Sequence, residues 1–169
     1  MTALRKPETT AAERWALRME IEEFHVAYAH TLDSGDLEHW PDYFTDDALY
    51  RITGRDNADF GLPIGLIYCD GRKMMNDRVR GTLRTMTFEP RYLRHLISNL
   101  WVGEAGADGS VAARANYLVV QTLMEEKTEI FQAGRYEDVF VRRDGRLLLR
   151  ERHCIYDSLT IPNALVYPI

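Results

Sequence analysis

The sequence predicts an α+β fold in which N-terminal helices pack against a cone-shaped, curled antiparallel sheet. Apolar residues recur every three or four positions over Ala11–Asp33, which indicates an amphipathic helix with one buried face. After Pro90 the helical pattern stops, and four long strand-like segments follow with short connections. Helices followed by a run of neighbouring strands are typical of an α+β domain.

The helical half begins with a polar tail over residues 1–10, in which Thr9 or Thr10 can cap the long helix. A Ser-Gly pair at 34–35 ends this helix, since both residues favour a turn. The stretch DLEHWPDYF then predicts a short second helix with Asp36 as its N-cap.

After the second helix the spacing of the apolar residues changes from the helical three or four positions to alternation. Alternating residues in TDDALYRITG (45–54) predict a strand, and the glycines and proline up to Gly65 predict an extended loop. Asp70 is the expected N-cap of a third helix that runs to about Leu83. We expect its buried side to carry Met74, Met75, Val79 and Leu83.

The second half of the chain reads as strands joined by the turn sequences GADG and RDGR, which predicts an antiparallel meander. Its expected strands are 92–104, 110–125, 128–142 and 146–158. We therefore expect a single domain over 1–169, divided into the tail 1–10, the helices, first strand and loop of 11–90, the meander of 91–158 and a C-terminal tail of 159–169.

Composition narrows the class of protein. With 169 residues, 46% of them apolar, the chain can fill one core, and its net charge of −5 offers no basic surface for nucleic acid or an anionic membrane. The N-terminus has no apolar run of signal-peptide length, so a cytoplasmic protein is expected. Cys69 and Cys154 lie far apart and form no paired motif, which predicts two reduced, inert thiols.

Metal chemistry receives little support from the five histidines. His25 and His30 are five apart on a helix, so they point about 140° away from each other and cannot chelate one ion. With His39, they are expected on a helix surface or flank. Metal binding would require His39, His95 or His153 to meet carboxylates through the fold, and we expect no metal site.

One set of residues can converge on a pocket inside the cone: Asp33, Tyr50 and His95. In YLRHLISNLWVG the residues Leu93, His95 and Ile97 share one strand face, so His95 is expected in the interior with Asp33 as its partner. An aspartate would fix the imidazole in one tautomer for general-base work, with the tyrosine as a hydrogen-bond donor. The alternative is that Asp33 only serves local hydrogen bonding at a helix end.

Several ordered segments resemble known proteins. YAHTLDSGDLEHWPDYFTDDALYRITG resembles the opening of the nuclear-transport-factor-2-like, or SnoaL-like, cone fold, which is also described as cystatin-like. MMNDRVRGTLRTMTFEPRYLRHLISNLWVG and AGRYEDVFVRRDGRLLLRERHCIYDS are similar to the small, or beta, subunit of aromatic-ring-hydroxylating dioxygenases. The resemblance runs from about Glu20 to Ser158.

This resemblance implies a structural subunit with no catalytic, cofactor-binding or metal-binding residues of its own. The implied partner is a large alpha subunit that holds a Rieske [2Fe–2S] cluster and a mononuclear Fe(II), commonly in an alpha3beta3 hexamer served by a reductase or ferredoxin. The sequence agrees, because it lacks the C-x-H and C-x-x-H pairs of a Rieske centre. The complex, and not this chain, would insert dioxygen into an aromatic compound.

The rival is a stand-alone cone enzyme, similar to a scytalone-dehydratase-like dehydratase or a ketosteroid-isomerase-like isomerase, that uses Asp33, Tyr50 and His95. Leu32 departs from that pattern, which tends to have a tyrosine before the aspartate. A third class is a cone that only binds a ligand.

The C-terminal stretch SLTIPNALVYPI is more apolar than a free tail normally is. It is expected either to dock against a neighbouring subunit, together with strand faces, or to pack back on its own sheet. Its apolar and aromatic residues are Ile161, Leu165, Val166, Tyr167 and Ile169.

Overall fold

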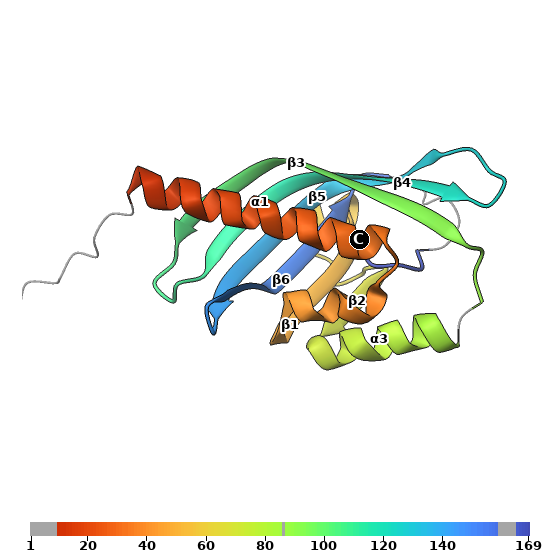
Figure 1. Ribbon diagram of the computed structural model, residues 1–169, viewed down its shortest axis with the longest axis horizontal. Helices are drawn as coiled ribbons and strands as arrows, with labels where there is room; N and C mark the ends of the chain where they lie inside the picture. The colour runs from red at the N-terminus through yellow and green to blue at the C-terminus, as the bar shows by residue number, and fades with distance from the viewer. Residues whose placement is uncertain (1–9, 86, 159–164) are drawn as a thin grey trace, which may run out of the picture.

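A computed structural model describes residues 10–85, 87–158 and 165–169. It contains a six-stranded curled sheet in the order β2-β1-β6-β5-β4-β3, with α1 lying across one face and α3 beside the β1–β2 edge (Figure 1). The helical elements are α1 (Ala11–Asp33), the 3-10 helix η1 (Leu37–Tyr43), α2 (Arg55–Asp59) and α3 (Arg72–Arg84). The strands are β1 (Phe44–Gly54), β2 (Ile67–Asp70), β3 (Arg91–Ala105), β4 (Val111–Leu123), β5 (Glu129–Arg143) and β6 (Arg146–Tyr156).

The long first helix is confirmed, together with its cap. Thr10 and Glu13 form a capping box, in which the Glu13 N–H donates to Thr10 Oγ1 (3.2 Å) and the Thr10 N–H donates to Glu13 Oε2 (2.7 Å). At the other end the Ser34 N–H donates to the His30 carbonyl. The buried face carries Ile21, His25, Tyr28, Ala29 and Leu32.

The four-strand antiparallel meander is also confirmed, as β3 to β6. The sheet as a whole is mixed, however, because β1 pairs with β6 in parallel. The predicted antiparallel pairing thus holds for every neighbouring pair of the six strands except β1 and β6. Six elements separate β1 from β6, so no short turn fixes the relative direction of these two strands.

The stretch between β1 and α3 is more regular than predicted. It contains α2 and β2 where a loop was expected, and Asp70 belongs to β2, so α3 begins after Gly71 without a side-chain cap. Met74 and Leu83 are exposed and not buried, whereas Met75 and Val79 are in the core. The buried stripe of α3 consists of Met75, Val79 and Thr82, and the helix contacts β1, η1 and β2.

The second predicted helix is a 3-10 helix, and Asp36 does not cap it. The Asp36 carboxylate instead accepts a hydrogen bond from Nδ1 of His39 (2.8 Å).

The end of the C-terminal tail packs back into its own domain. Val166 and Ile169 are buried, and Ile169 belongs to the hydrophobic core, so the alternative in which the tail packs back on its own domain describes residues 165–169. Ile161 lies outside the described residues.

Candidate functional site

The end of α1 meets β3 through Asp33 and His95, the two residues that the sequence paired. The Nδ1–H of His95 donates to Asp33 Oδ1 (2.7 Å), and the backbone N–H of His95 lies 3.1 and 3.2 Å from the two carboxylate oxygens. Because a carboxylate only accepts, the imidazole carries a proton on Nδ1. Its Nε2 is buried without a hydrogen-bond partner among the described residues.

This pair borders a groove of about 500 Å³ between α1 and β3. Arg18 spans the same boundary further along, since its Nη1 donates to the Leu100 carbonyl (2.7 Å). Arg18 and Asp33 are both on α1, and each hydrogen-bonds to the backbone of the edge strand β3, at Leu100 and at His95. The bonding therefore has a clear structural purpose, which is to cover the edge of the sheet.

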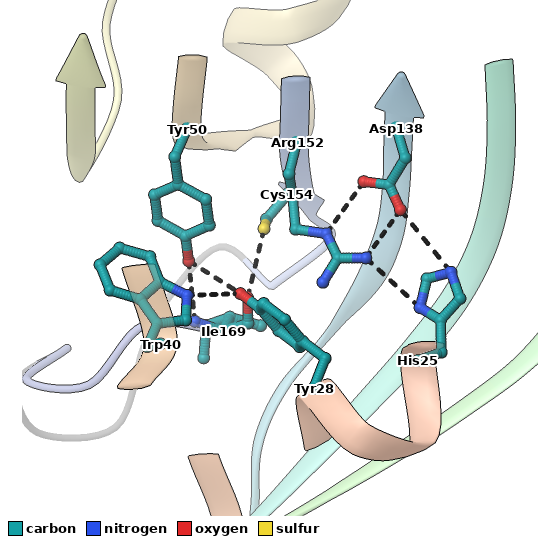
Figure 2. Close-up of polar contacts among 8 residues, drawn as sticks. All are labelled: His25, Tyr28, Trp40, Tyr50, Asp138, Arg152, Cys154 and Ile169. Atoms are coloured by element: carbon teal, nitrogen blue, oxygen red, sulfur yellow. Dashed lines mark hydrogen bonds and ion pairs between the residues drawn. The ribbon is translucent and has the colours of Figure 1, made fainter. Parts of the chain in front are cut away.

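Tyr50, the third predicted member, is not in this groove. It lies buried in the cone interior, where its hydroxyl donates to the Ile169 backbone oxygen (3.1 Å) and accepts from the Ile169 N–H (2.8 Å) (Figure 2). Tyr28 also donates to the Ile169 oxygen (3.0 Å) and accepts from Nε1 of Trp40 (2.9 Å). The backbone oxygen of Ile169 thus accepts a hydrogen bond from each of the two tyrosine hydroxyls that point into the interior.

These phenols stay protonated. Burial raises the pKa of Tyr28 and of Tyr50 above the ordinary value. Burial likewise raises the pKa of the Cys154 thiol to about 12, and its Sγ lies 3.6 Å from the Ile169 oxygen. The side chains of Tyr28, Tyr50 and Cys154 are therefore neutral hydrogen-bond donors, and none of the three is an activated nucleophile.

A buried ion pair lies beside this interior and was not predicted. Nε and Nη2 of Arg152 donate to the two oxygens of Asp138 (2.9 and 2.7 Å), and the guanidinium is sandwiched between the rings of Tyr28 and Tyr136, 4.2 Å from each centroid. Burial alone would lower the pKa of Arg152, but the charge and hydrogen bonds of Asp138 raise it well above the ordinary value. Arg152 is therefore a permanent buried cation.

His25 completes this cluster. The expectation that it lies on a helix surface was wrong, because it is buried and its Nδ1 accepts from Nη2 of Arg152 (3.3 Å). Burial and the charge of Arg152 lower its pKa to about 2, so the imidazole is neutral. Its spacing of four from Ile21 could have revealed its place on the buried face. His30 and His39 are exposed, as expected.

Metal ligation finds no support in the part of the chain that the structure describes. Within residues 10–85, 87–158 and 165–169, no three His, Cys, Asp or Glu side chains gather as a metal site would require. Both cysteines are free and buried. In the same residues, none of the helices is long and apolar enough to cross a membrane.

A curled sheet closed by an N-terminal helix, with polar groups directed into the cone, defines the nuclear-transport-factor-2-like class. A 1.50 Å structure from Novosphingobium aromaticivorans assigned as a scytalone dehydratase shares this fold, with a TM-score of 0.72 at 18% identity over 92% of this chain and 94% of that one. The sequence profile described as "Ring hydroxylating beta subunit" matches residues 27–163. The chain belongs to this family of ring-hydroxylating dioxygenase beta subunits.

Individual relatives of this chain support the same family assignment. The small subunit of anthranilate 1,2-dioxygenase from Burkholderia cepacia is 36% identical over 89% of this chain and 92% of its own length. A beta subunit of the terminal oxygenase component of terephthalate 1,2-dioxygenase from Comamonas sp is 32% identical over 89% of this chain and 97% of its own. A solved chain assigned as the beta subunit of an aromatic-ring-hydroxylating dioxygenase, from Novosphingobium aromaticivorans, has a TM-score of 0.83 at 38% identity, covering 92% of this chain and 99% of that one.

Proposed function

We propose that this chain is the structural, non-catalytic beta subunit of the terminal oxygenase component of an aromatic-ring-hydroxylating dioxygenase. In this role it serves the breakdown of aromatic compounds by holding the oxygenase together. The observation that carries the proposal is the family match over residues 27–163, which agrees with relatives that are themselves named small or beta subunits.

The filled space around Tyr50 supports a structural role. A cone enzyme that used Tyr50 would need room for a substrate beside its hydroxyl, whereas here the Ile169 backbone oxygen accepts hydrogen bonds from both Tyr28 and Tyr50 (Figure 2). The rival dehydratase or isomerase requires Tyr50 to meet Asp33 and His95. Tyr50 is engaged elsewhere, which leaves the histidine and the aspartate without the third group.

The proposed partner is a large alpha subunit that carries the Rieske [2Fe–2S] cluster and the mononuclear Fe(II), in an alpha3beta3 hexamer in the cytoplasm. A reductase or ferredoxin would deliver electrons to that subunit. The names of two relatives, anthranilate and terephthalate dioxygenase, favour an aromatic carboxylic acid as the substrate of the complex.

Co-expression with the large subunit of the same organism tests the proposal. We expect a mixed oligomer that contains iron and oxidises an aromatic acid when a reductase is supplied, while the chain expressed alone does neither. The proposal fails if the chain stays monodisperse beside the large subunit and itself dehydrates or isomerises a small ring compound, with loss of that activity in His95→Ala.

A further inference from the structure

An exposed apolar strip runs along one edge of the molecule, from the end of α2 into β2. Every second residue over 60–68 is a large apolar or aromatic one with its side chain in solvent. Their exposed fractions are 79% for Phe60, 46% for Leu62, 61% for Ile64, 48% for Leu66 and 55% for Tyr68. We call these five residues the 60–68 strip. Five such residues in one short stretch exceed the scattered apolar side chains of an ordinary surface.

The backbone of the strip is hydrogen-bonded to α2 at one end and to β1 at the other. The Leu66 N–H donates to the Ile52 carbonyl (2.8 Å), and the Leu62 N–H donates to the Asn57 carbonyl (2.8 Å). Gly65 lies so close to β1 that a Cβ on it would come within 2.6 Å of the Ile52 oxygen. The strip is thus fixed in place before any partner arrives, which lowers the entropy cost of docking.

The strip lies at the free edge of the sheet. β2 pairs only with β1, so the outer side of this four-residue strand has no neighbouring strand among the described residues (Figure 1). Met74 of α3 extends the apolar surface there, since its Sδ accepts from the Asp70 N–H (3.4 Å) and its side chain is exposed. A free edge with apolar side chains is a surface that proteins normally cover.

The charges beside the strip favour a partner other than a second copy. Asp56, Asp59 and Asp70 are exposed, and no ion pair within the described residues involves them, while the nearby Arg55 pairs with Asp157 (2.6 Å). Two copies meeting strip to strip would bring these carboxylates together, in a chain whose net charge is already −5. Like charges at an interface disfavour that pairing and favour a partner with a basic rim.

We propose that the 60–68 strip is the surface through which this chain docks onto the large subunit, in an apolar groove with basic residues at its rim. This inference rests on the proposed function, which supplies the large subunit as the partner. Ile64 is its central anchor, because it lies midway between Phe60 and Tyr68 and an apolar anchor at the centre of an interface contributes most to affinity.

The test compares two substitutions that place the same charge on equally exposed isoleucines. Ile64→Asp alters the strip, and Ile130→Asp alters β5, where Ile130 is 62% exposed. Each variant is co-expressed with the large subunit, and the affinity of the mixed complex is measured. We expect Ile130→Asp to assemble like the wild type, and Ile64→Asp to bind roughly thirtyfold or more weakly, the loss typical of a central anchor.

Hydrogen exchange of the wild-type complex gives a second readout that does not depend on the folding of a variant. We expect the amides of residues 60–68 to exchange more slowly in the complex than in the free chain. Equal assembly of all three chains, or unchanged exchange over 60–68, overturns the docking surface and leaves the proposed function standing. A wild-type chain that does not bind the large subunit overturns both.

The same experiment also detects the alternative in which the 60–68 strip binds a second copy of this chain. The result for a second copy would be a wild-type chain that self-associates on its own, an Ile64→Asp chain that is monomeric, and mixed assembly that the substitution does not affect. In that case the strip is an interface between copies, and the proposal is wrong.

Discussion

Arg152 and Asp138 show how one pair of residues is stabilised in the driest part of the molecule. Removing two charges from water is costly, and only the two parallel hydrogen bonds between them, with an aromatic ring on each side of the guanidinium, offset that cost. The pair therefore depends on both members. A single loss leaves an uncompensated charge, whereas the loss of both leaves an apolar space.

We predict that Arg152→Met lowers the free energy of unfolding by about 3–5 kcal/mol, because it strands the Asp138 carboxylate. Adding Asp138→Leu should recover most of the loss, since no buried charge then remains. Urea denaturation of both variants measures the difference. A double variant no more stable than Arg152→Met would show that packing of the guanidinium, and not its charge, is what matters.

His25 makes the stability depend on pH. Its pKa is about 2 in the folded chain, because burial and Arg152 disfavour the charged ring, but ordinary in the unfolded chain. Below pH ~6.5 the unfolded state binds the additional proton, so stability falls as the pH falls, by about 1.4 kcal/mol per pH unit. We predict that thermal melts from pH 7 to pH 4 show this decline.

His153 is the control for this effect. Burial, and then Arg51, lower its pKa to about 4, so it contributes over the same range but stops contributing near that value. Between pH ~6.5 and pH 4 the slope should be smaller in His25→Gln than in the wild type, and the contribution of His25 should remain in His153→Gln. An unchanged slope in His25→Gln would mean that other groups govern acid unfolding.

Among the elements, those with long periodic patterns could be predicted from sequence and the short ones could not. α1 and the four strands of the meander each carry a repeated apolar pattern with capping or turn residues at the ends. β2 has four residues, too few for a period, and becomes a strand only by pairing with β1. Its existence follows from the tertiary structure.

The same distinction explains which polar contacts could be predicted. Asp33 and His95 lie at a helix end and on an alternating strand, so each had a predictable place. His25 and Arg152 are 127 residues apart, and charged residues on strands normally face solvent. The signal that could have found Asp138 is its position between Tyr136 and Phe140 on one buried strand face.

Close contacts between strands give a prediction at this scale. Gly134 of β5 has no room for a side chain, because a Cβ there would lie 2.2 Å from the Ile155 oxygen and 2.8 Å from the Tyr117 hydroxyl. Gly81 of α3 has nothing within 4 Å of the same position. We predict that Gly134→Ala destabilises by about 3 kcal/mol or more, as overpacking against backbone does. Gly81→Ala should stabilise by roughly 0.5–1 kcal/mol.

Calorimetric melting checks that Gly134→Ala lowers the melting temperature and that Gly81→Ala raises it. Should Gly134→Ala melt within a degree of the wild type, β5 and β6 would have to be able to separate at that point, which the pairing of Gly134 with Tyr156 argues against.

At the scale of the whole molecule, the last residues and the first strand meet in the interior. Tyr50 and Ile169 are 119 residues apart, and the parallel pairing of β1 with β6 places Tyr50 beside Arg152 in the register of the sheet. The domain is thus closed from within by its own C-terminal residues. Sequence reasoning left open whether this segment docks inside or outside, because an apolar tail satisfies either arrangement.

This closure predicts that residues 166–169 are part of the folding unit. Deleting them removes the acceptor of the Tyr28 and Tyr50 hydroxyls and empties the space that Ile169 fills. We expect a loss of about 3–5 kcal/mol in the free energy of unfolding, together with binding of a dye that reports exposed apolar surface. Tyr50→Phe in the intact chain, which removes one hydroxyl and leaves the space filled, should cost only about 1–2 kcal/mol.

The comparison of these two variants separates the hydrogen bonds from the filling of space. If the deletion costs no more than Tyr50→Phe, the interior collapses readily around the missing residues, and the segment is only an accessory to the fold. If it costs several times more, the cone depends on this segment for its core, and the surface available to partners is the outside of the sheet and its edges.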